Sequence, residues 1–277
     1  MQVYRRMDIG TAKPTLEEMQ GIPHHMIDVA EPWEDFSVSR YCEMAAPIVD
    51  DIISRGKTAV IAGGTGLYMD ALIRGNAFAP FPATGVRERL EAQADAEGME
   101  AMLSRLRAVD PDAARRLHLS DRKRILRALE VYLETGETIT AHDARTRLRP
   151  PKYRAYTIGL TFRDRADLYE RIDCRVDTMV AQGLLQEVEA LLKSGLPETA
   201  TALQAIGYKQ FLSVYRGDTP ARDAVAEVKL RSRQYAKRQL TWLRRKEDIH
   251  WILWEKTPDF PAGLQNATEY LLAQGLG

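Results

Sequence analysis

The sequence predicts an α/β protein whose parallel sheet is interrupted by a helical insertion. Three observations predict this class. An apolar run at 57–63 ends in a glycine-rich corner, and a helical pattern follows it. Between 86 and about 148 the pattern is helical and rich in Arg and Glu, and strand patterns return after it. We therefore expect an α/β core made of 1–82 and 152–277, with a helical insertion at 83–151.

Local signals delimit the elements of the core. Ser37 or Ser39 can start the first helix and Gly56 can end it, while Pro80 and Pro82 break the pattern before the insertion. The core elements expected in order are a helix at 35–56, a buried parallel strand at 57–63, a helix at 67–75, a strand at 156–162, helices at 163–183, 184–195, 201–217 and 220–246, and a final strand at 249–255.

The insertion is expected to contain only helices. It is short of β-branched runs, and its helical patterns open with Asp or Thr, which are favoured at helix N-caps. The helices expected within it are at 99–109, 110–118, 121–136 and 138–148.

Composition excludes several classes of protein. The formal net charge is zero, so a polyanionic partner must be met by a local patch. Cys42 and Cys174 lie in no metal-binding spacing, and with no signal peptide they indicate a reducing, cytosolic setting. No apolar stretch approaches the roughly 20 residues that span a bilayer. We expect a soluble, cytoplasmic protein with no membrane partner.

The glycine-rich corner is the first candidate site. Gly63, Gly64 and Gly66 let backbone N–H groups approach an anion, and Thr65 places a hydroxyl beside the start of a helix. Ligands of open parallel sheets bind at this end of a strand. The alternative is a tight turn in which Thr65 only caps the helix.

Two clusters of basic residues are the other candidates. On the last helix, Lys229, Arg233, Lys237 and Arg244 fall on one stripe, and Arg231, Arg238 and Arg245 on another. In the insertion, 115–127 carries six basic residues against Asp121 alone. Together the clusters favour a polyphosphate such as RNA, although each could be a solvated helix face. Asp28, Asp173 and Asp177 could bind Mg²⁺ or form ion pairs.

Several motifs together resemble the tRNA dimethylallyltransferases, also called tRNA isopentenyltransferases. They follow in the family's order and spacing from residue 1 to about residue 254. The motifs are MQVYRRMDIGTAKP (1–14), PHHMID (23–28), FSV (36–38), GGTGLY (63–68), RALE (127–130), TGETIT (135–140), RVDTMVAQGL (175–184), QAIGYKQ (204–210) and YAKRQLTWLR (235–244).

The resemblance implies an activity and a fold. The activity is transfer of a dimethylallyl group from dimethylallyl diphosphate to N6 of the adenine 3′ of the anticodon, in tRNAs that read codons starting with U. The fold is a core like that of P-loop kinases, with a helical insertion that binds the anticodon stem-loop. The adenine would be flipped into a channel, and Mg²⁺ would assist the leaving diphosphate. We expect a monomer.

The resemblance also implies site residues. Thr65 is expected to act at the substrate adenosine, and we assign Arg175 and Arg238 to the diphosphate on chemical grounds. No metal ligand is assigned. The residues expected to contact tRNA are Met1, Gln2, Arg87, Lys123, Arg124, Ile125, Leu126, Arg127, Gln204, Ala205, Ile206, Gly207, Tyr208, Lys209, Lys237, Gln239 and Arg244.

One departure from the family pattern bears on activity. Family members open with a GPT-x-x-GKT phosphate loop and carry an Asp, the expected general base, two residues before the position of Met1. Neither feature is in this sequence. We therefore expect the 277-residue chain alone to be inactive, its Mg²⁺ ligands to lie largely outside it, and 57–63 to expose an apolar face. The alternatives are a non-catalytic RNA-binding remnant, an enzyme that prenylates free adenine nucleotides and a nucleotide kinase.

Overall fold

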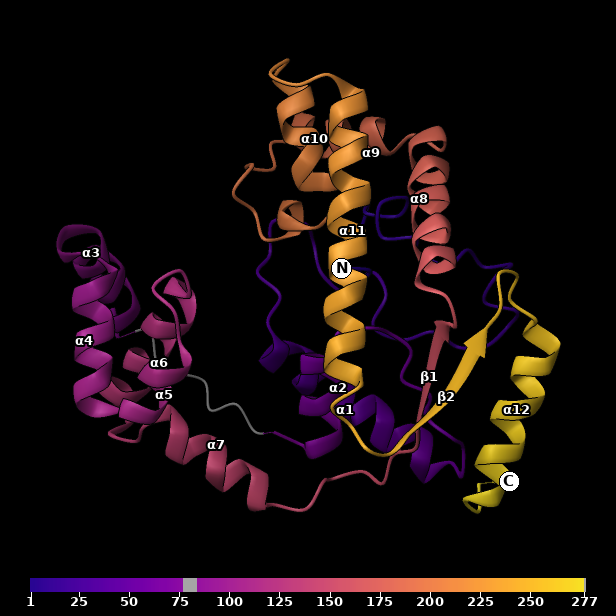
Figure 1. Cartoon of the computed structure of the whole chain (residues 1–277), viewed down its shortest axis with the longest axis horizontal. Helices are drawn as coiled ribbons and strands as arrows, with labels where there is room; N and C mark the ends of the chain where they lie inside the picture. Colours follow the sequence, from indigo (N-terminus) through magenta and orange to yellow (C-terminus); the bar gives the residue numbers. More distant parts are fainter. Residues whose placement is uncertain (77–83, 277) are drawn as a thin grey trace. The chain divides into compact units, whose positions relative to one another are not determined.

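The computed structural model describes residues 1–76 and 84–276. The chain forms two compact units (Figure 1). The core unit comprises Met1–Ile73 and Arg154–Gly277, and the helical unit comprises Arg74–Tyr153. The boundary predicted at 82/83 and the break at Pro80 and Pro82 lie outside the described residues.

The helical unit forms from short helices with strong local boundary signals. Asp110 and Thr138 accept hydrogen bonds from backbone N–H groups in the first turns of α5 and α7, and Gly136 ends α6 in a left-handed conformation with φ +70°. Met102, Leu106, Ile125 and Leu126 are buried in its core. The helices are α3 (Val86–Glu97), α4 (Met99–Val109), α5 (Pro111–Arg116), α6 (Arg122–Thr135) and α7 (Ile139–Leu148).

The core unit contains the remaining helices. Ser37 caps the first helix, α1, through its hydroxyl, and Asp164 caps the helix that begins at Arg165, α8, through its carboxylate. The helices are α1 (Val38–Ser54), α2 (Gly66–Arg74), α8 (Arg165–Ala181), α9 (Leu184–Lys193), α10 (Tyr208–Tyr215), α11 (Ala221–Leu243) and α12 (Phe260–Ala273).

The sheet of the core unit has two parallel strands in the described part of the chain. β1 (Thr157–Phe162) pairs with β2 (Ile249–Trp254), with Thr157 opposite Ile249 (Figure 1). An isolated parallel bridge joins Tyr4 to Ala30. The parallel strands and the many helices confirm the predicted α/β class.

The strand predicted at 57–63 is not formed. A β-strand needs a neighbour that completes its ladder of hydrogen bonds, and no described segment pairs with these residues. The segment is consequently far from buried, and the side chain of Val60 is 84% exposed. The apolar exposure expected along this segment is present, whereas the strand itself is a correction to the sequence prediction.

Two helix predictions also need correction. The helix expected at 201–217 is divided, because a 3-10 turn at Ala202–Gln204 precedes α10 and Gly207 takes a φ of +100° between them. Helix α12 was not predicted, although Asp259 caps it and Pro261 occupies its first turn. Among the described helices, none is long and apolar enough to cross a membrane.

The core unit packs around α9, α10 and α11. Tyr208, Phe211, Leu184 and Val188 are fully or almost fully buried there. Tyr4 and Met7 join the same core from the N-terminal loop, defined as residues 1–35. A loop without helix or extended strand is thus anchored by two large apolar side chains.

Candidate active site

The glycine-rich loop, residues 63–66, lies against α11 in the core unit. Thr65 is exposed, and its carbonyl accepts hydrogen bonds from the backbone N–H groups of Tyr68 and Met69 in the first turn of α2. The Thr65 hydroxyl lies 3.4 Å from the hydroxyl of Tyr235 on α11. Thr65 therefore presents its hydroxyl outside the helix end rather than capping it.

Tyr235 is a site residue that the sequence analysis missed. Its side chain is 37% exposed. The guanidinium carbon of Arg238 lies 5.6 Å from the centre of the Tyr235 ring. Tyr235 thus links the Thr65 hydroxyl on one side to the Arg238 cation on the other. Its place at the head of the YAKRQLTWLR motif was the available signal.

Two cations near the middle of α11 are neutralised by α8. Lys229 pairs with Asp177 at 2.7 Å, and Arg233 pairs with Asp173 at 2.7 Å. This result confirms the ion-pair interpretation of the two aspartates. The predicted basic stripe is therefore a helix-to-helix contact over this stretch, and it can offer an anion less charge than the sequence indicated.

The cations nearer the end of α11 are available to an anion. Lys237, Arg238 and Arg244 are exposed, and none of them forms an ion pair within residues 1–76 and 84–276. Arg175 is also exposed on α8, but it lies about 200° around that helix from Asp173, which faces α11. Arg238 and Thr65 therefore both lie beside Tyr235, whereas no contact in the described chain joins Arg175 to Thr65 or Tyr235.

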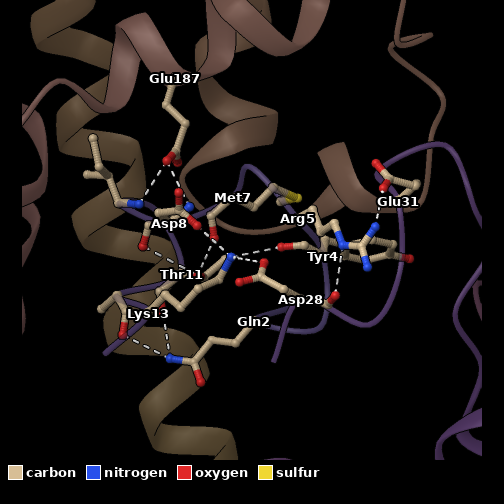
Figure 2. A network of polar contacts seen from close by, with 12 residues as sticks. Gln2, Tyr4, Arg5, Met7, Asp8, Thr11, Lys13, Asp28, Glu31 and Glu187 are labelled. Carbon is tan, nitrogen blue, oxygen red and sulfur yellow. Dashed lines mark hydrogen bonds and ion pairs between the residues drawn. The ribbon is translucent and has the colours of Figure 1, made fainter. Parts of the chain in front are cut away.

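The N-terminal loop is held by a network of polar contacts around Lys13 (Figure 2). The Lys13 ammonium donates to the Tyr4 carbonyl and to the carboxylates of Asp8 and Asp28, and its side chain is only 7% exposed. Asp28 adopts a left-handed φ of +55°, a conformation that such a network can hold in place. Asp28 thus serves as an ion-pair partner here.

Gln2 belongs to the same network. Its amide donates to the carbonyls of Thr11 at 3.2 Å and Ala12 at 2.9 Å (Figure 2). Met1 beside it is exposed. Of these two expected tRNA contacts, Met1 is the more accessible, because the amide hydrogens of Gln2 already have partners within the loop.

Glu187 joins the N-terminal loop to α9 and α10. Its carboxylate accepts the backbone N–H groups of Asp8, Ile9 and Gly10, at 2.8, 2.8 and 3.1 Å (Figure 2). The Tyr208 hydroxyl also donates to it. Burial, reinforced by the bond to the Glu187 carboxylate, raises the pKa of the Tyr208 phenol above its ordinary value.

The QAIGYKQ segment divides between surface and core. Gln204 and Lys209 are exposed, Ala205 and Ile206 are half-buried, and Gly207 is buried. Tyr208 is 0% exposed. The Tyr208 phenol is thus enclosed by the core and committed to Glu187, and the tRNA contact expected at this position stays a prediction.

The helical unit shows the same division along α6. Lys123 and Arg124 are exposed, but Ile125 and Leu126 are fully buried in the unit's core. The side chains of Ile125 and Leu126 are therefore turned away from solvent, and the tRNA contact expected at these two positions stays a prediction. The alternation follows from helix geometry, since neighbouring residues lie 100° apart.

The basic cluster at 115–127 is partly compensated by acids outside the segment, on α3 and further along α6. Arg122 pairs with Glu91 and Asp95 of α3, each at 2.8 Å. Arg87 pairs with Glu91 at 2.6 Å, and Arg127 pairs with Glu130 at 2.9 Å. The sequence indicated only Asp121 as a counterion, so the folded cluster is less positive than expected.

The residues present do not form a metal-binding group of their own. In the described part of the chain, no three His, Cys, Asp or Glu side chains converge as a metal site would require. The carboxylates of Asp173, Asp177 and Asp28 are engaged by cations. We therefore derive no step through Mg²⁺ from these side chains.

Comparison with known proteins identifies the family. The family model described as IPP transferase matches residues 2–246. The tRNA dimethylallyltransferase of Acetivibrio thermocellus is 41% identical over 277 residues, covering 100% of this chain and 88% of that protein. The tRNA dimethylallyltransferase of Desulforamulus reducens is 47% identical over 255 residues, covering 91% of this chain and 89% of that protein.

Solved structures agree with these relatives. The full-length tRNA isopentenylpyrophosphate transferase of Bacillus halodurans superposes with a TM-score of 0.70 at 38% identity, over 98% of this chain and 84% of that one. A eukaryotic dimethylallyltransferase acting on tRNA gives a TM-score of 0.81 at 28% identity, over 99% of this chain and 69% of that one. With motifs, family model and relatives in agreement, this chain belongs to the IPP transferase family.

Proposed function

We propose that this chain transfers a dimethylallyl group from dimethylallyl diphosphate to N6 of the adenine 3′ of the anticodon, in tRNAs that read codons starting with U. The observation that carries the proposal is the grouping of Thr65, Tyr235 and Arg238. In this group two hydroxyls lie beside a cation in the core unit, and the cation forms no ion pair in the described chain. The relatives named as tRNA dimethylallyltransferases support the same reaction.

The chemistry assigns separate tasks to these side chains. The N6 lone pair forms a bond to the allylic C1 carbon, the C1–O bond breaks, and the diphosphate leaves with the electron pair. The surplus N6 proton passes to solvent. Arg238 would stabilise the negative charge that develops on the diphosphate, with Arg175 as a second candidate for this task. The Thr65 hydroxyl would orient the adenine edge so that N6 faces C1.

The proposed partner is the tRNA anticodon stem-loop. Exposed cations of the helical unit, among them Lys123 and Arg124, would contact phosphates of the stem, and Lys237, Arg244 and Lys209 of the core unit would contact the loop. Each phosphate contact releases counterions, so the affinity would fall with salt. Substituting Lys123 by Ala would reduce the slope of log K against log salt by about 0.9.

The test is an assay with an anticodon stem-loop RNA, dimethylallyl diphosphate and Mg²⁺, followed by mass spectrometry of the nucleosides. Prenylated adenosine would support the transfer reaction and overturn the inactivity expected from the missing phosphate loop and Asp. None is expected from an RNA that carries guanine at the target position, because guanine has no N6 amine. AMP replaces the RNA in a parallel reaction, and prenylation of AMP alone would favour the nucleotide-prenylating alternative. Salt-dependent RNA binding with no product would favour the non-catalytic RNA-binding alternative.

We also propose that the protein is monomeric and cytoplasmic. The free cysteines, Cys42 and Cys174, are compatible with a reducing compartment. Light scattering coupled to gel filtration measures the molar mass, and a value near 31.3 kDa is expected. Twice that mass would overturn the monomer.

A further inference from the structure

The glycine-rich loop is held from outside by two side chains of α11. The Gln239 amide donates to the Gly64 carbonyl at 2.9 Å. The Trp242 ring covers Gly66, where an added Cβ atom would lie 2.2 Å from the ring. Both contacts require the backbone of the loop to approach α11 more closely than a side chain would allow.

The loop has few other restraints before Thr65. Residues 57–63 form no strand within the described chain. On the other side, the Thr65 carbonyl is tied to α2 through the N–H groups of Tyr68 and Met69, at 3.1 and 3.3 Å. Thr65 is therefore held on one side by its hydrogen bonds to α2, and on the other by the hydrogen bond that Gln239 makes with Gly64.

The other contacts of the loop restrain the orientation of Thr65 less than the Gln239–Gly64 hydrogen bond does. The Thr65–Tyr235 contact is long at 3.4 Å, which marks a weak hydrogen bond. The Trp242 contact is apolar and has little directional preference. A normal 2.9 Å hydrogen bond at the neighbouring residue fixes both the position and the rotation of the peptide plane that precedes Thr65.

We propose that Gln239 is a positioning residue, whose amide holds the Gly64 carbonyl so that the Thr65 hydroxyl stays beside Tyr235. This assignment replaces the direct tRNA contact expected of Gln239 from the sequence. It rests on the proposed function for its kinetic consequence, but its structural consequence can be measured without turnover. Gln239 acts through Thr65 and is not itself a catalytic residue.

The structural arm measures hydrogen exchange in Gln239→Leu, with Gln234→Leu as the matched control. Gln234 lies on the same helix, and its side-chain amide oxygen accepts from Arg231 at 3.2 Å. The Tyr68 and Met69 amides should exchange about tenfold faster in Gln239→Leu, because a hydrogen bond that restrains the adjoining loop is lost. Their rates should not change in Gln234→Leu. Unchanged exchange in Gln239→Leu would overturn the proposal, whatever the enzyme does.

The kinetic arm separates positioning from tRNA contact. Positioning lowers kcat about tenfold or more and leaves KM and Kd for the RNA within about twofold. Gln239→Leu should add little to the loss caused by Thr65→Val, since both changes act on one hydroxyl. Gln239→His retains an N–H donor and should recover part of kcat. A rise in Kd for the RNA with kcat unchanged would overturn the proposal.

The two arms fail in different ways. If the unsubstituted chain yields no prenylated RNA, the proposed function fails, and the exchange rates alone decide the role of Gln239. If Gln239→Leu does not fold, its thermal melt will show this, and Gln239→Glu, which also lacks the N–H donor, then takes its place in the exchange measurement. Faster exchange at Tyr68 and Met69 in Gln239→Glu than in Gln239→His supports the proposal, and equal exchange in the two variants would overturn it.

Discussion

Glu187 and Asp8, 179 residues apart in sequence, are joined by a 2.8 Å hydrogen bond from the Asp8 backbone N–H to the Glu187 carboxylate. The same carboxylate accepts the next two backbone N–H groups and the Tyr208 hydroxyl. Gly10 must approach so closely that an added Cβ would lie 2.5 Å from the Tyr208 ring. One side chain of α9 thus secures the turn of the N-terminal loop.

Replacing Glu187 by Gln should destabilise the core unit by about 2–3 kcal/mol. The NH₂ group of the new amide would face backbone N–H groups that now donate to a carboxylate oxygen. These N–H groups would be left without an acceptor. All four tryptophans, at 33, 242, 251 and 254, belong to the core unit, so their fluorescence during urea unfolding reports this unit.

Glu189→Gln is the matched control for this variant. It is the same substitution on the same helix, at a residue that forms only an exposed pair with Lys193 at 3.4 Å. Its free energy of unfolding should change by less than about 1 kcal/mol. Equal losses in the two variants would contradict the anchoring role of Glu187.

Asp110→Asn should destabilise the helical unit by about 1.5–3 kcal/mol. The buried Asp110 carboxylate accepts the Ala113 N–H at 2.9 Å and both the N–H and the hydroxyl of Thr140, at 3.0 and 2.8 Å. An asparagine would turn an NH₂ donor toward one of these donors. Far-UV circular dichroism should show an earlier unfolding step, while tryptophan fluorescence keeps its midpoint. A shared shift of both signals would contradict a local effect.

The same carboxyl should make the helical unit sensitive to acid. Burial by itself favours the neutral acid, but the hydrogen bonds from Ala113 and Thr140 and the nearby Arg116 outweigh it and lower the pKa of Asp110 below its ordinary value. A depressed pKa contributes stability above the unfolded-state value, and the contribution is lost as pH falls through the folded-state value. The free energy of unfolding, measured by urea melts with circular dichroism, should fall below about pH 4. In Asp110→Asn it should fall less steeply with pH. Equal slopes in the two proteins would exclude this carboxyl as the cause.

Gly66→Ala should cost more stability than Gly64→Ala. The new methyl at 66 would lie 2.2 Å from the rigid Trp242 ring, and at 64 it would lie 2.0 Å from the flexible end of Gln239. Overpacking costs about 1–3 kcal/mol, which exceeds the roughly 1 kcal/mol gained in helix propensity at Gly66. Thermal melts should rank the variants in this order, and Trp242→Leu should recover part of the loss at 66. The reverse ranking would show that Trp242 yields easily.

Arg238→Ala should lower kcat/KM for dimethylallyl diphosphate by about 100-fold, because the cation beside Tyr235 would stabilise the leaving diphosphate. The control is Arg231→Ala on the same helix, where the arginine is paired with Glu227 at 2.6 Å. That variant should stay within about threefold of the unsubstituted chain. Equal effects of the two changes would indicate a general loss of positive charge on α11.

Most helix boundaries could be predicted because their signals are local. Ser37, Asp110 and Thr138 cap helices through bonds to N–H groups three residues on, and the apolar spacing that follows is a property of the same short stretch. The 57–63 segment has an equally clear pattern, yet it is no strand, since a strand depends on a partner elsewhere in the chain. Helix α12 carries an equally local signal, the Asp259 cap followed by Pro261.

The sequence by itself determined the family, the α/β class, most helices and the candidate residue Thr65, because motifs and periodicity lie in contiguous residues. Only the tertiary structure decided that Glu91 and Asp95 neutralise Arg122. It also decided that the Tyr208 hydroxyl donates to Glu187, and that Tyr235 and Gln239 contact the glycine-rich loop. Each of these outcomes depends on which groups meet across tens or hundreds of residues. Charge compensation and hydrogen bonding act over a few ångströms in space, and linear spacing does not record that distance.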